Sequence, residues 1–170
     1  VVVRNSQTGA TAVRVRPFTV PRMEESEMAL LPPLFPEPPG KWLLAREEDS
    51  ADQRYGYDYP FMRQGQPYIP AAKPVVSAGG EAPVSLIGYN LASGSLRMAG
   101  ELYGVDGKPV EGVELLVDER ADTGDPTIEQ IAGRLRTPKL VAGEYRLVVT
   151  VTDESTGASR ASEIPVVVSG

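Results

Sequence analysis

Cysteine and histidine are both absent from the 170 residues of this chain. Without them the chain has no disulfide, no thiol nucleophile, no histidine general base and none of the usual zinc ligand sets. No run of about 18 apolar residues occurs, so we expect no membrane insertion. No catalytic motif stands out among the residues that remain. The sequence therefore predicts that the chain is not an enzyme and holds no cofactor.

Positive charge is also in short supply, since the formal net charge is -6. An acidic chain is poorly suited to a nucleic-acid backbone, so we expect no nucleic-acid partner. Glycine and proline are abundant, with 17 and 16 residues, whereas aromatic residues make up only 6%. This composition is typical of short strands joined by many turns and predicts an all-β fold.

The clearest strand pattern lies near the end of the chain. Tyr145, Leu147, Val149 and Val151 alternate with more polar residues, which is the period of a strand with one buried face. The polar run 153–157 ends in a glycine and predicts a turn. A second strand follows, with Ile164, Val166 and Val168 on one face, so the chain is expected to close with a β-hairpin.

The first twenty residues repeat this hairpin. Residues 1–20 align without a gap on 149–168, and seven positions are identical. The identical residues are Val1, Val3, Thr8, Gly9, Ala10, Pro17 and Val20. The segment 1–20 is therefore interpreted as the terminal hairpin of a preceding β-module. The alternative is that two hairpins with a Thr-Gly turn resemble each other by chance.

A lone hairpin is marginally stable in water, so its apolar residues need a partner. We expect Val1, Val3, Val13 and Val15 to be buried in an interface, because burying one valine is worth about 1.5–3 kcal/mol. The partner is either an upstream domain of the same chain or a neighbouring copy.

Residues 21–72 have a different character, that of an extended linker with short strands. The stretch 32–40 is too rich in proline for a helix or an inner strand. Trp42, Tyr55, Tyr57 and Tyr59 follow it and form a candidate platform for a sugar or an extended peptide. The alternative is that these rings cover a sheet edge or a domain joint.

Residues 73–170 show strands separated by turns every 8 to 12 residues, which predicts an immunoglobulin-like β-sandwich. One segment breaks the pattern. Ile128, Ile131 and Leu135 lie at helical spacing after Pro126, so a short inserted helix is expected over 126–136.

Four acidic residues gather just before this segment: Asp118, Glu119, Asp122 and Asp125. Oxygen ligands in a flexible loop suit calcium, so these residues are candidate calcium ligands. Their spacing does not match an EF-hand loop. The alternative is a solvated acidic loop with no metal.

The order of motifs after residue 60 resembles the C-terminal region of bacterial von Willebrand factor A-related proteins. The motifs are Gln66-Pro-Tyr-Ile-Pro70, Val84-Ser-Leu-Ile-Gly-Tyr-Asn90, Gly104-Val-Asp-Gly-Lys-Pro109 and Gly143-x-Tyr-x-Leu147. The resemblance implies immunoglobulin-like modules behind a metal-binding α/β domain. The Asp-x-Ser-x-Ser motif of that domain is absent here, so such a metal site would lie upstream. The resemblance also implies export, to the cell surface, the periplasm or the medium.

These observations together predict a non-catalytic structural or adhesive module that spaces domains or mediates protein–protein assembly. Two alternatives stay open. One is a filament subunit in which residues 1–20 complete the sheet of a neighbour. The other is a carbohydrate- or peptide-binding module.

Overall fold

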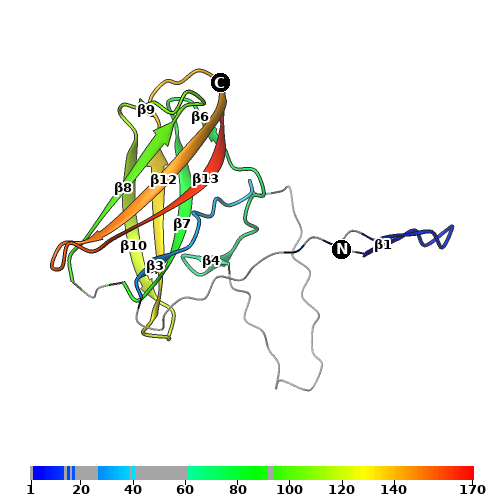
Figure 1. Ribbon diagram of the computed structural model, residues 1–170, viewed down its shortest axis with the longest axis horizontal. Coiled ribbons are helices and arrows are strands. Elements are labelled where there is room, and N and C mark those ends of the chain that lie inside the picture. The colour runs from blue at the N-terminus through cyan, green and yellow to red at the C-terminus, as the bar shows by residue number, and fades with distance from the viewer. Residues whose placement is uncertain are drawn as a thin grey trace.

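The computed structural model describes residues 2–13, 15, 17, 27–38, 40, 61–91 and 94–170. In this part of the chain every regular element is a strand, and two sheets pack face to face (Figure 1). The prediction of an all-β chain built as a sandwich is therefore confirmed. These residues contain no helix long and apolar enough to cross a membrane.

One sheet has four strands in the order β10-β11-β7-β3, and the other has five in the order β6-β13-β12-β8-β9. The first contains β10 (Glu114–Asp122), β11 (Ile128–Arg136), β7 (Glu81–Tyr89) and β3 (Ala29–Leu30). The second contains β6 (Val75–Ser77), β13 (Ser159–Ser169), β12 (Gly143–Asp153), β8 (Leu96–Tyr103) and β9 (Pro109–Val110). Paired strands run antiparallel, apart from β6, which is parallel to β13. The chain changes sheet between β3 and β6, between β6 and β7, between β7 and β8, between β9 and β10, and between β11 and β12.

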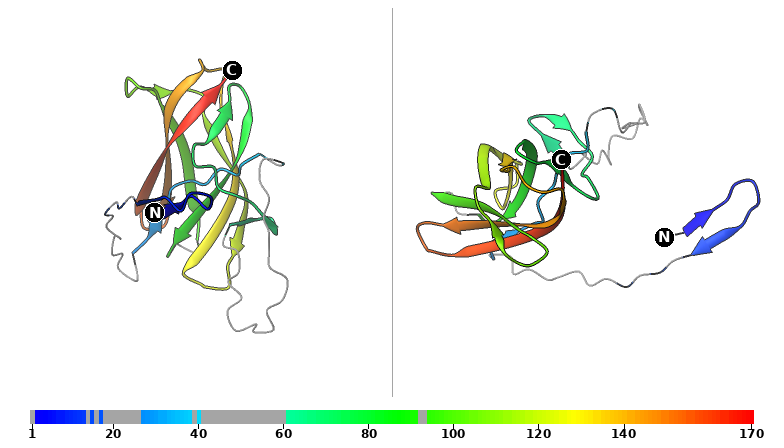
Figure 2. Two further views of the ribbon diagram at one scale, coloured as in Figure 1. Left: turned by 90° about the vertical axis from the view of Figure 1, so that its right-hand side faces the viewer. Right: turned by 90° about the horizontal axis from the view of Figure 1, so that it is seen from above.

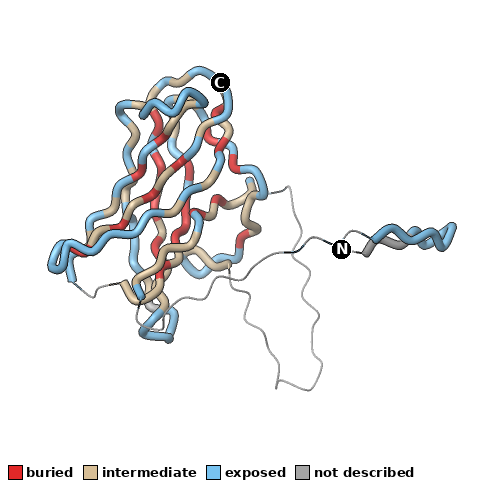
Figure 3. Tube along the Cα trace, in the orientation of Figure 1, coloured by how far each residue is buried: buried red, intermediate tan, exposed pale blue. Residues whose placement is uncertain are grey.

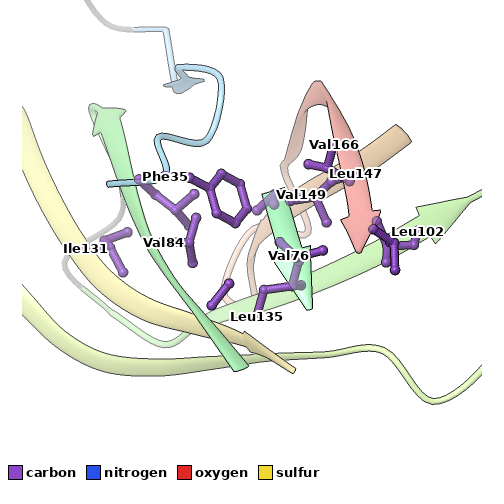
Figure 4. Close-up of a cluster of buried hydrophobic side chains, with 12 residues drawn as sticks. Phe35, Val76, Val84, Leu102, Ile131, Leu135, Leu147, Val149 and Val166 are labelled. Carbon is purple, nitrogen blue, oxygen red and sulfur yellow. The ribbon is translucent and has the colours of Figure 1, made fainter. Parts of the chain in front are cut away.

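The core lies between the sheets and follows the period-two pattern of the long strands. On β12, Leu147, Val149 and Val151 are fully buried, while the residues between them are partly exposed. Val166 and Val168 on β13 and Val84 and Leu86 on β7 are buried in the same way. Figure 3 shows buried positions recurring along the long strands, and Figure 4 shows Leu147, Val149, Val166 and Val84 among the side chains between the sheets. Because burying each side chain is worth about 1.5–3 kcal/mol, this alternation stabilises the sandwich.

The segment 126–136, for which the spacing predicted a helix, is mainly strand β11, so the predicted helix is wrong. Ile131 and Leu135 are buried, and the equally buried Gly133 lies between them, so inward positions recur at every second residue. Glycine has no side chain and therefore hid this period in the sequence. It is required here, because a Cβ atom on Gly133 would lie 2.7 Å from the carbonyl oxygen of Leu116.

Residues before 73 also belong to the packed body. β3 pairs with the end of β7, and Leu34 forms a β-bridge with Ser85. Phe35 is only 3% exposed and lies in the core (Figure 4). The sequence predicted a linker over 21–72 and a sandwich from 73, whereas the segment 27–38 supplies an edge strand and a core ring.

A small hairpin of β4 (Met62–Arg63) and β5 (Gln66–Pro67) covers part of the outer face of the four-stranded sheet. Its turn lies at Gln64-Gly65, where both residues have positive φ. The guanidinium of Arg63 donates to the carbonyl of Gly133 at 3.3 Å and to the carboxylate of Asp118 at 3.4 Å. These contacts hold the hairpin against β10 and β11.

The two ends of the sandwich carry different loops and are named here by their position in Figure 1. The upper end holds the C-terminus and the turns 78–80, 104–108 and 137–142, joined by bonds such as Gly79 N–H to the Pro138 carbonyl at 2.8 Å. The lower end holds the loop 123–127 and the β12–β13 turn 154–158. Glu27 lies there too, 2.8 Å from the guanidinium of Arg160. The chain therefore enters the sandwich at the lower end, and β13 finishes at the upper end.

Candidate interaction surfaces

The hairpin near the start of the chain, called the first hairpin below, stands apart from the sandwich (Figures 1 and 2). It consists of β1 (Val2–Arg4) and β2 (Thr11–Val13). The side-chain oxygen of Asn5 accepts hydrogen bonds from the backbone N–H groups of Gln7 and Thr8, at 2.9 and 3.0 Å. Gly9 has a φ of +71° and donates to the Asn5 carbonyl at 2.9 Å. An asparagine that binds the amides following it fixes a turn locally, so this hairpin turn is encoded by its own residues.

The turn between β12 and β13 has the same geometry. Asp153 takes the place of Asn5, and Gly157, with a φ of +73°, takes that of Gly9. The backbone hydrogen bonds correspond as well. Asn5 N–H donates to Ala10 O at 2.8 Å, as Asp153 N–H does to Ala158 O at 2.9 Å. Gly9 N–H donates to Asn5 O at 2.9 Å, as Gly157 N–H does to Asp153 O at 2.8 Å. The side-chain bond from Ala10 N–H to the Thr8 hydroxyl, at 3.3 Å, recurs from Ala158 N–H to Thr156 at 3.2 Å.

The strand register also agrees. Val2 pairs with Val13 in the first hairpin, and Thr150 pairs with Ala161 in the second. Thr150 lies 148 positions after Val2, and Ala161 lies 148 positions after Val13, which is the offset of the sequence alignment. The likeness of the two hairpins therefore extends from residue identity to hydrogen bonds and pairing.

The four valines predicted to need a partner lie on or beside this first hairpin. Val13 is 64% exposed and Val15 is 84% exposed, so the described residues of the sandwich do not cover them. Val3 pairs with Ala12 through its backbone, and its side chain lies outside the described residues, as does Val1 altogether. Val13 and Val15 are thus uncovered by the part of the chain that the structure describes.

A hollow of about 650 Å³ lies on the outer side of the five-stranded sheet, near the upper end. Tyr103 on β8, Arg146 on β12 and Pro165 on β13 line it. The guanidinium carbon of Arg146 lies 5.0 Å from the centre of the Tyr103 ring, a cation–π contact. Lys73 and Glu144 form an ion pair of 3.1 Å in its lining.

The electrostatics of the hollow are set by neighbouring charged groups. The Tyr103 hydroxyl donates to the carboxylate of Glu101 at 3.0 Å, and this bond raises the pKa of Tyr103. The sequence analysis singled out neither Tyr103 nor Arg146. The signal was present, since both lie at outward positions next to the inward-facing Leu102 and Leu147. A surface of this kind, apolar with charged groups around it, suits a protein or sugar surface.

Ion pairs cross the outer face of the four-stranded sheet. Arg134 contacts Asp118 at 2.8 Å and Glu81 at 2.9 Å, and Arg136 contacts Glu81 at 2.8 Å and Glu114 at 3.0 Å. Hydrogen bonds from Arg136 and then Arg134 lower the pKa of Glu81, and one from Arg134 lowers the pKa of Asp118. These side chains are largely solvated, so each pair adds little stability.

The same contacts bear on the candidate calcium ligands. The Asp118 carboxylate is engaged by Arg134 and Arg63, and that of Asp125 accepts bonds from the N–H and hydroxyl of Thr127 at 2.9 and 2.6 Å. Glu119 lies on β10 beside the β4–β5 hairpin, and the side chain of Asp122 is outside the described residues. In the part of the chain that the structure describes, no three acidic side chains form a group that could hold a metal ion. Asp118, Glu119 and Asp122 lie on strand β10 and not in a flexible loop, and the calcium hypothesis gains no support.

The aromatic platform predicted from the sequence cannot be placed. Trp42, Tyr55, Tyr57 and Tyr59 all lie outside the described residues. The hypothesis that they bind a sugar or a peptide stays a prediction.

Comparison with known proteins yields little. No protein-family model and no curated protein matches the chain. Among solved structures, a family 123 glycoside hydrolase from Clostridium perfringens, studied for glycolipid glycan hydrolysis, matches with a TM-score of 0.41 and 11% identity. The match covers 57% of this chain and 22% of that chain. A likeness this distant assigns no reaction, substrate or residue to the present chain.

One expectation is corrected by this finding. The sequence predicted that the chain is not an enzyme, because no catalytic motif or cleft was visible in it. A solved structure that the chain matches is nevertheless that of an enzyme, so the exclusion of enzymatic activity is withdrawn.

Proposed function

We propose that this chain is a β-sandwich module of a tandem array, which spaces neighbouring domains and mediates their assembly. The repeated hairpin carries this proposal. Residues 2–13 have the turn, register and hydrogen bonds of residues 150–161. The first hairpin is accordingly the lower tip of a preceding sandwich of the same kind.

The exposure of the hairpin supports the same proposal. A two-stranded hairpin is marginal in water by itself. With the offset of 148, Val1 and Val3 correspond to Val149 and Val151, which are buried in the core here, whereas Val13 and Val15 correspond to the outward, exposed positions Ala161 and Glu163. In a preceding sandwich the equivalent strands gain a neighbour and a core, as β12 and β13 do here.

We also propose that the sandwich is immunoglobulin-like. Support comes from the four-plus-five strand order, from the repeated change of sheet along the chain and from the parallel pairing of β6 with β13. The Tyr145 hydroxyl donates to the carbonyl of Val141 at 2.9 Å. A tyrosine near the start of the penultimate strand that bonds to backbone a few residues upstream is a hallmark of that fold.

An exported parent protein belongs to this proposal as well. It rests on the resemblance to bacterial von Willebrand factor A-related proteins, in which such modules follow a larger domain. On this proposal the module acts at the cell surface, in the periplasm or in the medium, and its partners are other domains.

Deletion of residues 1–20 tests the proposal against strand complementation. If the hairpin belongs to another module, the deleted chain keeps its thermal midpoint to within about 2 °C, which corresponds to less than about 1 kcal/mol. Sedimentation at micromolar concentration shows a monomer before and after deletion. A fall in the midpoint, or an oligomer that the deletion dissolves, would instead show that the hairpin completes this sandwich or that of a neighbour.

A further inference from the structure

The upper end of the sandwich carries apolar side chains that the fold leaves uncovered. Val105 in the turn 104–108 is 91% exposed, and Val141 in the turn 137–142 is 81% exposed. Val75 on β6, at the same end, is 60% exposed. Val105 also lines the hollow beside Tyr103, which extends the apolar surface onto the outer face of the sheet. Single exposed valines are ordinary, but a group at one end of a module marks a contact surface.

The path of the chain indicates what meets this surface. With the offset of 148, Ser169, the last residue of β13, corresponds to Pro21. Glu27, where the chain enters the lower end of the present sandwich, follows only six positions later. A chain extends by at most about 3.6 Å per residue, so the upper end of one module lies within about 20 Å of the lower end of the next.

This distance is short compared with the sandwich itself. β12 has 11 residues, and at about 3.3 Å per residue it spans roughly 35 Å from end to end. Two consecutive modules therefore cannot lie side by side in the same direction, because the linker would have to run the full height of a sandwich. The upper end of one must adjoin the lower end of the other.

The lower end is built as a rigid counterpart. Asp153 binds the hydroxyls of Ser155 and Thr156, both at 2.6 Å, and the hydroxyl of Ser95 donates to Glu154 at 2.6 Å. The turn 154–158 is thus fixed by its own side chains before any contact forms. A preorganised surface loses little conformational freedom on docking.

We infer that the upper end around Val105 and Val141 is a docking surface for the lower end of the next copy of this module, so that the array stacks end to end. This inference rests on the proposed tandem arrangement. It adds to that arrangement a specific contact between turn 154–158 of one copy and turns 104–108 and 137–142 of another. In separate chains the same contact forms weakly and is detectable at high protein concentration.

The absence of cysteine allows a clean test by disulfide trapping. Chains carrying Val105→Cys and chains carrying Ser155→Cys are mixed in equal amounts at high concentration and oxidised. We expect disulfide-linked heterodimers, which join Val105→Cys of one chain to Ser155→Cys of another, in several-fold excess over the proportion that random pairing would give. Adding Val141→Asp to the Val105→Cys chain should return the ratio to the random value, since the Val141 carbonyl keeps its bond to Tyr145 and the turn stays folded.

Ala99→Cys provides the matched control. Ala99 is exposed on the outer side of β8, away from both ends, and should pair with Val105→Cys only at the random ratio. A random ratio for Val105→Cys with Ser155→Cys, or equal trapping of Ala99→Cys, would overturn end-to-end docking. If the deletion of residues 1–20 still leaves the sandwich unchanged, the tandem proposal stands and only the docking inference falls.

Discussion

Asp153 shows how a single residue fixes the lower tip. Its carboxylate accepts hydrogen bonds from the hydroxyls of Ser155 and Thr156 and from the Ser155 N–H. These donors lower its pKa to about 2. Asn5 occupies the same place in the first hairpin and accepts backbone bonds as a neutral amide. The turn geometry therefore needs an acceptor, whereas the charge adds a pH dependence.

The variant Asp153→Asn tests this pH dependence. A carboxyl group whose pKa is lowered by folding stabilises the fold above its ordinary pKa of 3.8 and loses that contribution as the pH falls to about 2. We expect Asp153→Asn to be less stable than the natural chain at neutral pH. The difference between their free energies of unfolding should shrink as the pH falls from 3.8 to about 2. Urea unfolding at a series of pH values measures it. Glu154→Gln controls for the loss of one charge at the tip, and a gap that stays constant with pH would contradict the assignment.

At the scale of elements, the two hairpins offer a matched pair of glycines. Gly9 and Gly157 have φ values of +71° and +73°, and a Cβ atom on either would meet nothing within 4 Å. Alanine at such a position costs about 1–2 kcal/mol from backbone strain alone. Alanine therefore causes the same backbone strain at both positions, but at Gly9 the strain falls on the β1–β2 hairpin and at Gly157 it falls on the sandwich.

We expect Gly157→Ala to lower the free energy of unfolding of the sandwich by about 1–2 kcal/mol. Gly9→Ala should leave that free energy unchanged, because its hairpin lies outside the cooperative unit of this chain. Urea denaturation of both variants, followed by circular dichroism, gives the comparison. Equal losses in the two variants would mean that the first hairpin packs on this sandwich.

β11 shows why the sequence pattern predicted a helix where the structure has a strand. Ile131 and Leu135 are inward-facing residues of a strand, and the position between them is Gly133. A glycine adds nothing to the hydrophobic pattern, so the spacing imitated a helix. By contrast, β12 carries a large apolar residue at each inward position, and its strand pattern was clear.

At the scale of the whole molecule, Phe35 decides where the sandwich begins. Its ring is 3% exposed and lies in the core, although the proline-rich stretch around it indicated a linker. We expect Phe35→Ala to lower the free energy of unfolding by about 3–5 kcal/mol, the usual cost of removing a buried aromatic ring. Val141→Ala, at a position that is 81% exposed, is the control and should change little. Urea unfolding measures both variants. Similar free energies of unfolding for the two would mean that residues 27–38 are part of the linker and not of the sandwich.

Strand alternation marks Tyr103 and Arg146 as outward-facing residues, but it does not show that they line one hollow. Tyr103, Arg146 and Pro165 are far apart in sequence and meet because β8, β12 and β13 are neighbours in one sheet. Val105 and Val141 share the upper end for the same reason. Their exposure, which motivates the docking inference, depends on which loops the strand order brings together.

The sequence by itself determined the β class, the alternation of β12 and β13 and the repeat of the hairpin at residues 1–20, because each depends on neighbours along the chain. Asn5 and Asp153 fix their turns through amides only two or three residues away. Only the tertiary structure decided that β11 is a strand, that Phe35 belongs to the core and that the sandwich has two chemically different ends. Those features arise from contacts between distant segments, and the close approach of Gly133 to Leu116 is one that no local pattern records.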